Sequence, residues 1–279
     1  MACVIVVGSI NQDVTVTVDR FPTPGETLSG SSLTYGLGGK GANQAAAAAR
    51  SGIPTLFVGA VGTDLAGHSL RTHLAAHGVD VSHLREVDSP SGTALITVAA
   101  SGENTIILDA GANRASSIAH AKASLFPAPS DIVVLQAEIP PAANAAAIEW
   151  AHSFGARVLL NLAPARATDP ATLSRVDILV VNETEAGLTL GMPAPATPTE
   201  AIGVARALRG MGPRHVVVTM GAQGAAWASG AEARHSPAIT LGEAVDTTGA
   251  GDACVGELAA ALALGKPFDE AVADGMRAG

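Results

Sequence analysis

The sequence places an acidic residue in the first turn of an expected helix, directly after a run of small residues. Residues 245–252 read Val-Asp-Thr-Thr-Gly-Ala-Gly-Asp and are followed by a long apolar stretch. The first turn of a helix presents unpaired backbone amides that can bind an anion. The carboxylate of Asp252 could accept a proton from an attacking hydroxyl while those amides offset charge on a transferred phosphoryl group. The spacing is equally compatible with Asp252 acting only on the helix dipole, an effect of about 0.3 to 1 kcal/mol.

A glycine-rich turn at residues 36–41 leads into a second expected helix, which starts at Ala42. The turn formally fits the dinucleotide pattern G-x-G-x-x-G, but it follows a suspected hairpin instead of the first core strand. It fails the Walker pattern because Lys40 is followed by glycine and not by Ser or Thr. Lys40 and Asn43 could meet a polar ligand at the start of the helix. An ordinary strand-to-helix turn is the alternative.

Asn182 and Glu185 follow the apolar run 178–181, where a core strand is expected to lead into a helix. Ligands collect at such strand ends, and these two side chains could hold a hydrated Mg²⁺ against phosphate oxygens. Their spacing also fits a helix capping box, which is the better explanation of the segment in isolation. Gly221 and Gly224 mark a tight turn after another apolar run, for which a hairpin is the alternative.

Short β-branched runs alternate with longer Ala-rich segments along most of the chain. This pattern predicts an α/β fold with a mainly parallel sheet flanked by helices. The expected strands are 4–7, 55–60, 132–135, 158–162, 178–181 and 216–220, and the expected helices are 42–50, 67–77, 142–154, 200–209 and 250–264.

Two regions, 14–35 and 93–108, interrupt this alternation and are predicted to be hairpins. In the first, valines alternate with polar residues from Val14 to Asp19, as in a strand with one face in water. We expect a small β-sheet lid beside the core, with ordinary edge strands as the alternative. The expected boundaries are 13–38 and 92–110 for the lid, and 1–12, 39–91 and 111–279 for the core.

The composition argues against several classes of partner. Lys and Arg total 16 against 25 Asp and Glu, a formal net charge of -9, which would repel a nucleic-acid backbone. No apolar run reaches the roughly 18 residues that span a bilayer, and residues 2–7 lack a basic leader. The two distant cysteines, Cys3 and Cys254, suggest neither a disulfide framework nor a zinc site. We therefore expect a cytoplasmic protein that binds neither nucleic acid nor membranes.

Taken in order along the chain, these segments resemble the signatures of the ribokinase family of carbohydrate kinases. The matching segments are 8–13, 21–27, 38–45, 109–113, 136–138, 182–185, 219–224 and 246–252. The resemblance implies that the sugar is bound by Asn11, Asp13, Gly39, Lys40, Asn43, Glu138 and Asp252. It implies that Asn182, Glu185, Thr219, Gly221 and Gly224 surround the phosphates of ATP and its Mg²⁺, with Glu185 reaching the metal through water. It further implies an anion hole of Gly249, Ala250 and Gly251 beside Asp252 as the general base.

Two departures from the family pattern qualify this resemblance. The family has residues beyond Ala278-Gly279 that wall the adenine and complete a monovalent-cation site, so Asp246 and Thr248 would form an incomplete potassium site. Cys254-Val255 also stand where the family usually has an aromatic and a polar residue.

The resemblance implies ATP-dependent phosphorylation of a pentose, with D-ribose to D-ribose 5-phosphate as the leading expectation. A kinase for another small sugar or a nucleoside is the alternative within the family. A catalytically silent sugar-binding protein is suggested by the short C-terminus and opposed by the intact turn at 249–252. A dehydrogenase comes last, because its motif is misplaced. Since residues 14–18 offer an apolar face on an edge sheet, we also expect two lids to pair in a homodimer.

Overall fold

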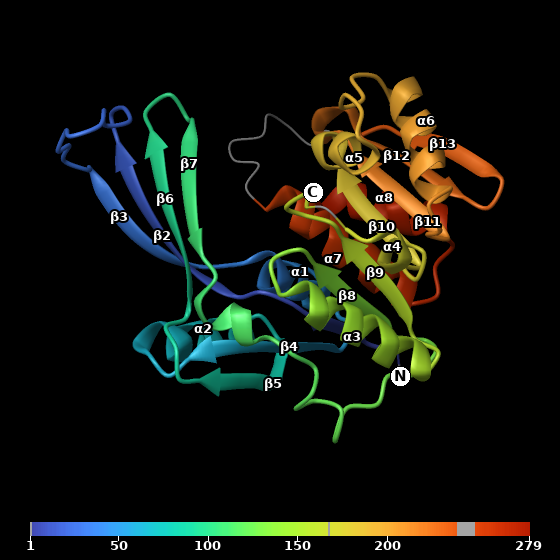
Figure 1. The fold of residues 1–279 in the computed structure, drawn as a ribbon, viewed down its shortest axis with the longest axis horizontal. Coiled ribbons are helices and arrows are strands. Elements are labelled where there is room, and N and C mark those ends of the chain that lie inside the picture. Colours follow the sequence, from blue (N-terminus) through green and yellow to red (C-terminus); the bar gives the residue numbers. More distant parts are fainter. Residues whose placement is uncertain (1, 167, 239–248) are drawn as a thin grey trace.

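A computed structural model describes residues 2–166, 168–238 and 249–279, and a nine-stranded sheet runs through it (Figure 1). In spatial order the strands are β13 (Glu232–Ser236), β12 (Ala225–Ser229), β11 (His215–Thr219), β10 (Ile178–Asn182), β9 (Arg157–Asn161), β8 (Ile132–Gln136), β1 (Val4–Val7), β4 (Thr55–Gly62) and β5 (Asp80–Val87). The strands from β11 to β5 pair in parallel, and β12 and β13 add to one edge in antiparallel fashion. This arrangement confirms the α/β fold with a mainly parallel sheet.

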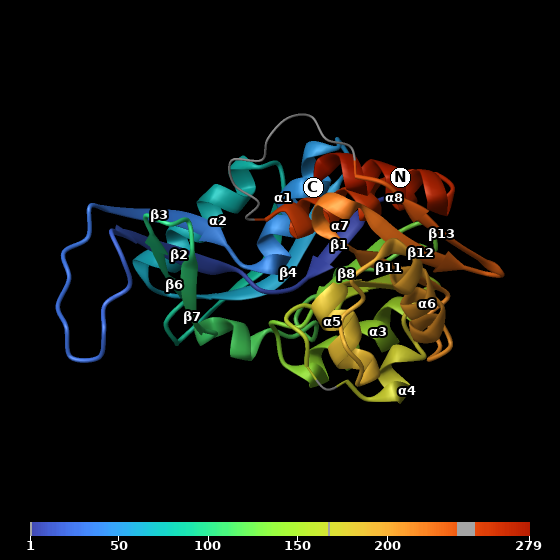
Figure 2. The same ribbon diagram turned by 90° about the horizontal axis from the view of Figure 1, so that it is seen from above.

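Helices cover both faces of this sheet (Figure 2). One face packs against α3 (Pro141–Ser153), α5 (Glu183–Leu190) and α6 (Pro198–Arg209), and the other against α1 (Lys40–Arg50), α2 (Leu65–Ala76), α7 (Ala250–Ala263) and α8 (Phe268–Ala278). Strand β1 shows how one strand serves both layers, because Ile5 packs in the cluster with α3 while Val4 packs in the cluster with α1 and α7. The shorter helical segments are α4 (Pro170–Leu173), η1 (Gly111–Ala115) and η2 (Gly221–Gln223).

A separate four-stranded sheet stands beside the main one, at the left of Figure 1. Its spatial order is β3 (Ser32–Gly38), β2 (Asn11–Val18), β6 (Gly92–Ala99) and β7 (Asn104–Asp109). Strands β2 and β3 form one antiparallel hairpin, β6 and β7 form another, and β2 pairs with β6 in parallel. Both expected hairpins are therefore confirmed, and they join into one sheet instead of extending the edges of the main sheet.

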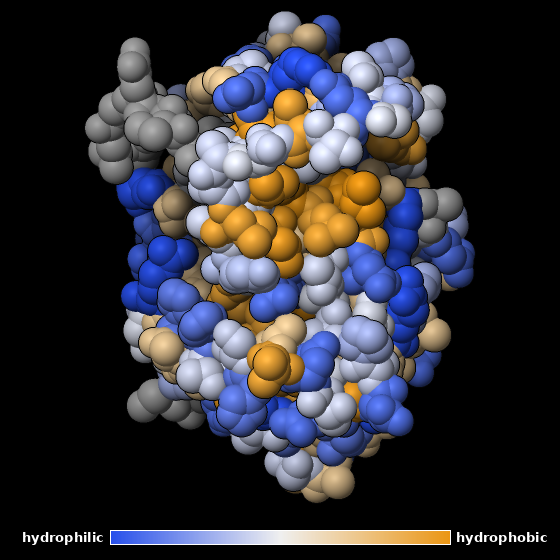
Figure 3. Space-filling view, turned by 90° about the vertical axis from the view of Figure 1, so that its left-hand side faces the viewer, coloured by the Kyte–Doolittle hydropathy of each residue, from blue (hydrophilic) through white to orange (hydrophobic). Residues whose placement is uncertain are grey.

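One face of the small sheet carries exposed apolar side chains. Tyr35 and Leu95 lie opposite Val14 in the register, and Ile107 lies opposite Leu95, so these four residues cross the sheet on one face. Tyr35, Leu95 and Ile107 are all exposed, and hydrophobic side chains gather over this side of the molecule in Figure 3. The apolar face expected around Val14 is thus uncovered in the monomer.

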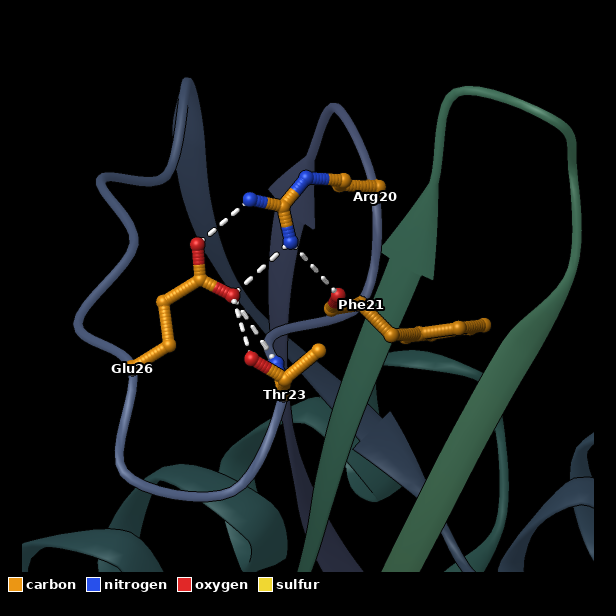
Figure 4. Close-up of polar contacts among 4 residues, drawn as sticks. All are labelled: Arg20, Phe21, Thr23 and Glu26. Atoms are coloured by element: carbon orange, nitrogen blue, oxygen red, sulfur yellow. Dashed lines mark hydrogen bonds and ion pairs between the residues drawn. The ribbon is translucent and has the colours of Figure 1, made fainter.

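The connection between β2 and β3 is stabilised by hydrogen bonds to the carboxylate of Glu26 (Figure 4). The guanidinium of Arg20 donates to both carboxylate oxygens of Glu26, and the backbone N–H and hydroxyl of Thr23 donate to Oε2 of Glu26 at 2.9 and 3.1 Å. These donors, Arg20 first, lower the pKa of Glu26 to about 2. The long loop therefore has a charge-assisted turn of its own near the far end of the sheet.

The predicted core strands begin within one residue of their positions in the structure. The sequence predicts a helix start at Asn182 and a hairpin at Gly221 without giving ranges for α5 and β12, and it predicts no range for β5, β13, α4 or α8. Exposed residues alternate with half-buried ones along most of β5 and β13, because these strands form the two edges of the sheet. They therefore lack the continuous apolar run that marks the central strands. No helix in the described part of the chain is long and apolar enough to cross a membrane.

The close packing of α1 on α7 gives a stability prediction. A Cβ atom at Gly256 of α7 would lie 2.5 Å from Cβ of Ala47 and 2.5 Å from the carbonyl oxygen of Gln44. We expect Gly256→Ala to reduce the free energy of unfolding by about 1 to 3 kcal/mol, because neither helix backbone can move freely. The matched control is Gly203→Ala in α6, where a Cβ would meet no atom within 4 Å. That control should raise stability by about 0.5 to 1 kcal/mol, and urea denaturation of both variants would show whether the signs differ as expected.

Candidate active site

Several polar side chains lie together at the carboxyl edge of the main sheet. Because β1, β8, β9, β10 and β11 are parallel, their last residues meet at the same edge. Gln136, Asn161, Asn182 and Thr219 are the final residues of four of these strands, and Ser9 follows the fifth. The topology thus places one polar residue per strand at this edge.

Asp252 lies in the first turn of α7 and is held by two amides from α1. Its Oδ2 accepts a hydrogen bond from Nδ2 of Asn43 at 3.1 Å, and its Oδ1 accepts one from Nε2 of Gln44 at 2.9 Å. The side chain is buried, with 7% of the residue exposed, so the two amides supply partners that water would otherwise provide. The structure therefore brings two of the predicted site residues, Asn43 and Asp252, into direct contact although they are far apart in the sequence.

The first turn of α7 is built for close approach from outside. Gly249 precedes the helix with φ +80°, and a Cβ on Gly249 or Gly251 would meet no described atom within 4 Å. Among the described residues no side chain caps this helix start. No described atom therefore blocks the segment 249–251, and its role as an anion hole stays a prediction. The other two predicted residues of this loop, Asp246 and Thr248, lie outside the described residues.

Glu138 follows β8 and anchors the start of α1. Its Oε2 accepts hydrogen bonds from the hydroxyl of Ser9 at 2.6 Å and from the backbone N–H of Lys40 at 3.1 Å. Gly39 adopts φ +89°, and a Cβ there would lie 2.9 Å from the backbone nitrogen of Asn11. The glycine turn is thus required by the close passage of two chain segments, and it brings Gly39, Lys40 and Glu138 together.

Asn11 and Asp13 lie on β2, next to this turn. Nδ2 of Asn113 donates to Oδ1 of Asn11 at 2.7 Å and to the backbone oxygen of Ile10 at 3.1 Å, which fixes the start of β2. Burial, followed by the nearby charge of Glu138, raises the pKa of Asp13 to about 6. The carboxylate of Asp13 therefore lies in a site that disfavours its charge.

Asn182 and Glu185 form a complete capping box at the start of α5. Oδ1 of Asn182 accepts from the backbone N–H of Glu185 at 2.8 Å, and Oε2 of Glu185 accepts from the backbone N–H of Asn182 at 2.9 Å. The pKa of Glu185 is raised overall, and burial is the largest cause. The hydrogen bond from the Asn182 N–H and the charge of Lys40 lower this pKa, whereas the charge of Asp252 raises it. The capping explanation is confirmed, and the same carboxylate lies within electrostatic reach of Lys40 and Asp252.

Thr219, Gly221 and Gly224 lie one strand further along the edge. Thr219 pairs with Asn182 in the sheet register, and its hydroxyl donates to the backbone oxygen of Val181 at 3.4 Å. Gly221 and Gly224 have φ +50° and +91° and flank η2, between the antiparallel strands β11 and β12. The hairpin interpretation of this turn is therefore correct, and it places the turn beside Asn182.

Five supporting residues, four of which lie in the segments that resemble the family, have no role assigned from the sequence: Ser9, Gln44, Asn113, Gln136 and Asn161. Four of them are amides with at most 7% of the residue exposed, and Ser9 is fully buried. Their signal in the sequence is a polar residue at the end of an apolar strand or within an alanine run, where burial demands a hydrogen-bond partner. Which partner each would find could not be read from the sequence.

The raised pKa of Asp13 gives a prediction for stability. The native state binds a proton at Asp13 more tightly than the unfolded chain, whose ordinary pKa is 3.8, so the free energy of unfolding falls as the pH rises from about 4 to about 6. We expect Asp13→Asn, which cannot ionise, to raise the melting temperature at pH 7 and to lose most of this advantage at pH 4. Asp19→Asn, in an exposed position on the same hairpin, should change the melting temperature by the same amount at pH 4 and at pH 7. If Asp13→Asn also changed it equally at the two pH values, the conclusion that burial disfavours the charge of Asp13 would be wrong.

Comparison with known proteins agrees with this geometry. The family model described as pfkB family carbohydrate kinase matches residues 1–279. The chain is 37% identical over 275 residues to a ribokinase of Haemophilus influenzae, covering 98% of this chain and 89% of the relative. It is 36% identical over 267 residues to a deoxyribokinase of Salmonella typhi, covering 91% and 83%.

A solved structure of Arabidopsis thaliana ribokinase, described as complexed with ribose and ATP, superposes with a TM-score of 0.90 at 33% identity. The superposition covers 99% of this chain and 91% of that one. With the family model spanning the whole length, and with a ribokinase relative of this similarity, the chain belongs to the pfkB family of carbohydrate kinases.

Proposed function

We propose that this protein transfers the terminal phosphoryl group of ATP to D-ribose, giving D-ribose 5-phosphate. The observation that carries the proposal is the buried carboxylate of Asp252 in the first turn of α7, held by the side-chain amide of Asn43 near the start of α1. The names of the similar proteins and the ribose and ATP bound by the Arabidopsis ribokinase support the choice of substrates.

In this proposal Asp252 accepts the proton of the primary hydroxyl as it attacks the γ-phosphorus. A sugar hydroxyl is a weak nucleophile, so transfer depends on positioning, on a nearby proton acceptor and on neutralising the phosphoryl charge. The backbone N–H groups of Gly249, Ala250 and Gly251 would supply the neutralisation, which is supported by the lack of any described atom within 4 Å of a Cβ at Gly249 or Gly251.

The sugar would lie between the small sheet and the starts of α1 and α7. Asn11, Asp13, Lys40, Asn43 and Glu138 line this region. Asn11 is oriented by Asn113, and Glu138 is fixed by Ser9 and the Lys40 N–H, so their geometry is set before a ligand arrives. Gly39 allows the two segments to approach each other. We assign the small sheet, residues 13–38 and 92–110, as the lid that excludes water from the reacting phosphate.

The nucleotide phosphates would lie along the ends of β10 and β11, beside Asn182, Glu185, Thr219, Gly221 and Gly224. No group of three or more His, Cys, Asp or Glu in the described residues could hold a metal ion by itself. The donor set nevertheless suits Mg²⁺, which keeps several waters and takes one or two carboxylates together with substrate phosphates. Glu185 uses Oε2 in the capping box, which leaves Oε1 for a hydrated ion. When bound, the ion would neutralise charge on the phosphate oxygens.

Three further features belong to this proposal. Asp246 and Thr248 would contribute to a potassium site next to the anion hole. The exposed apolar face of the small sheet supports a homodimer formed through two lids. The two cysteines are free, as expected of a cytoplasmic location.

A panel assay for ADP release would test the substrate assignment. The panel would contain D-ribose, 2-deoxy-D-ribose, D-fructose and adenosine, each with and without potassium. We expect D-ribose to give the highest kcat/KM. Because a relative at 36% identity is a deoxyribokinase, 2-deoxy-D-ribose is the second candidate, and a higher kcat/KM for it would replace ribose in the proposal. If none of these four acceptors supported the release of ADP, the proposed function would be refuted.

Substitution of Asp252 tests its role as the base. We expect Asp252→Asn to lower kcat by about 10²- to 10⁴-fold, the usual contribution of a general base, while KM for the sugar changes little. Asp269→Asn is the matched control, because Asp269 is an exposed acid in the first turn of α8. If both variants kept the parent kcat, Asp252 would act only on its helix dipole.

A further inference from the structure

A chain of side-chain amides connects the centre of the main sheet to Asp252. Gln44 is its central member. Nε2 of Gln44 donates to Oδ1 of Asp252 at 2.9 Å and to Oδ1 of Asn161 at 3.0 Å, while Oε1 of Gln44 accepts from Nε2 of Gln136 at 2.8 Å. Gln44 and Gln136 are fully buried, so bulk water does not reach them to replace these bonds. Both donor hydrogens and the oxygen of the Gln44 amide group are therefore engaged by fixed partners.

A backbone carbonyl fixes the direction of the hydrogen bonds in this chain of amides. Nδ2 of Asn161 donates to the carbonyl oxygen of Val180 in β10 at 3.1 Å. Since a carbonyl can only accept, Asn161 must turn its own oxygen toward Gln44, and Gln44 must then present its NH₂ group. Gln136 reinforces this orientation, because its donor meets the Gln44 oxygen. The sheet thereby dictates that Asp252 receives a donor from Gln44.

Gln136 is itself confined by the chain around it. A Cβ on Gly8 would lie 2.1 Å from Oε1 of Gln136, so only glycine leaves room for this side chain. On its other side the backbone oxygen of Gln136 accepts from Nδ2 of Asn144 at 2.7 Å. The amide chain thus begins at a fixed strand and ends at the proposed base.

We infer that Gln44 is a positioning residue that fixes the carboxylate of Asp252 for proton transfer. The inference rests on the proposed function, in which Asp252 is the base. Together with Asn43, Gln44 engages both oxygens of Asp252, which stops rotation of the carboxylate. Small errors in the placement of a reacting group cost large factors in rate, so the effect of Gln44 belongs to kcat.

A double-mutant cycle would test this role. Gln44→Met keeps the length of the side chain and removes its hydrogen bonds. We expect kcat to fall roughly 10- to 100-fold with KM for the sugar within about twofold. In the Asp252→Asn background the same substitution should lower kcat by less than about twofold, because the group that Gln44 positions no longer acts as a base. A purely structural role for Gln44 would instead give the same loss in both backgrounds and would overturn the inference.

Thr55→Val is the matched control for a lost buried hydrogen bond. Thr55 begins β4, at the amino end of that strand and away from the amide chain; it is 3% exposed, and its hydroxyl donates to the backbone oxygen of Ile53 at 3.1 Å. The melting temperature of Thr55→Val should fall because the Ile53 carbonyl loses this partner, while kcat per folded molecule stays at the parent value. Turnover by the parent tests the proposed function separately, so an active parent with an unimpaired Gln44→Met variant would refute the positioning role alone.

A second feature, independent of the first, is a basic cavity of about 340 Å³. It lies at the amino ends of the parallel strands, on the side of the main sheet opposite the carboxyl edge that carries the candidate active site. It is lined by residues just before, or at, the starts of β9, β10 and β11, whereas Asp252 lies near the ends of these strands. The charged or titratable residues of its lining are His152, Arg157, Arg175, Asp177 and Arg214. Three arginines thus face one aspartate in a chain whose formal net charge is -9.

Asp177 is already engaged by the protein. Its Oδ2 accepts from the backbone N–H of Val158 at 2.9 Å and lies 3.2 Å from Nε2 of His152, and its Oδ1 lies 3.4 Å from Nε of Arg214. Arg157 donates to the backbone oxygen of Leu262 at 2.9 Å, and no ion pair to it is found within the described residues. Burial lowers the pKa of Arg157 more than Asp177 raises it, so the charge of this guanidinium is incompletely compensated.

We propose that this cavity binds a small phosphorylated metabolite, with Arg157 and Arg214 as its main contacts. Guanidinium groups match phosphate oxygens in a bidentate manner, and the cavity volume falls in the usual range for small-molecule sites. Strands β9 and β10 run from this cavity directly to Asn161 and Asn182, so an occupant would contact the same strands that carry the proposed catalytic edge.

Calorimetric titration with inorganic phosphate would test this site, with ADP and ribose present in excess to fill the catalytic cleft. We expect Arg157→Gln and Arg214→Gln each to weaken phosphate binding roughly tenfold or more, as for loss of a charged hydrogen bond. Arg214 is 77% exposed in its side chain, so its replacement should leave the fold intact. Arg234→Gln on β13 is the control and should bind as the parent does. Absence of saturable binding to the parent, or equal affinity in all variants, would overturn the proposal.

Discussion

The candidate active site depends on the contact between α1 and α7, two helices from opposite ends of the chain. Their backbones approach closely because Gly256 has no side chain, and this approach lets Asn43 and Gln44 reach both oxygens of Asp252. A buried carboxylate without such partners would be strongly destabilising. The same two hydrogen bonds therefore satisfy the core and hold the proposed base in one orientation before a substrate arrives, which reduces the reorganisation needed during the reaction.

The parallel sheet supplies the remaining groups. A parallel strand order places every carboxyl end at one edge, so a single polar residue at the end of each apolar strand is enough to build a continuous polar surface. Glu138, Asn161, Asn182 and Thr219 reach the site in this way, from the ends of β8, β9, β10 and β11 or just beyond them. The small sheet adds Asn11 and Asp13 from the side, because β2 begins at Asn11, a short connection after β1 ends at Val7.

Much of this arrangement could be predicted from the sequence, and what could not has a physical reason. The central strands were marked by continuous apolar runs, whereas β5 and β13, at the sheet edges, expose alternate residues and gave no such signal. Spacing alone left Asp252 undecided between a base and a helix-dipole residue, because its partners lie 208 and 209 residues away. For Glu185 the two interpretations proved compatible, since the capping box uses only one carboxylate oxygen. The hydrogen bonds of the amide chain through Gln44 could not be predicted from the sequence, because their direction depends on the position of a backbone carbonyl, that of Val180.

Acidic groups are concentrated at this edge, and this has a consequence for stability. Asp13 lies near the charge of Glu138, and Glu185 lies near that of Asp252, while Lys40 is the cation that lowers the pKa of Glu185. Burial raises the pKa of both Asp13 and Glu185, so ionised carboxylates are unfavourable at this edge. In the proposed function, a hydrated cation beside Glu185 and sugar hydroxyls that donate to Asp13 would stabilise these charges. Ligand binding would then offset the cost of burying the two carboxylates, which would link the low intrinsic stability of the site to its affinity for ligands that bring hydrogen-bond donors and positive charge.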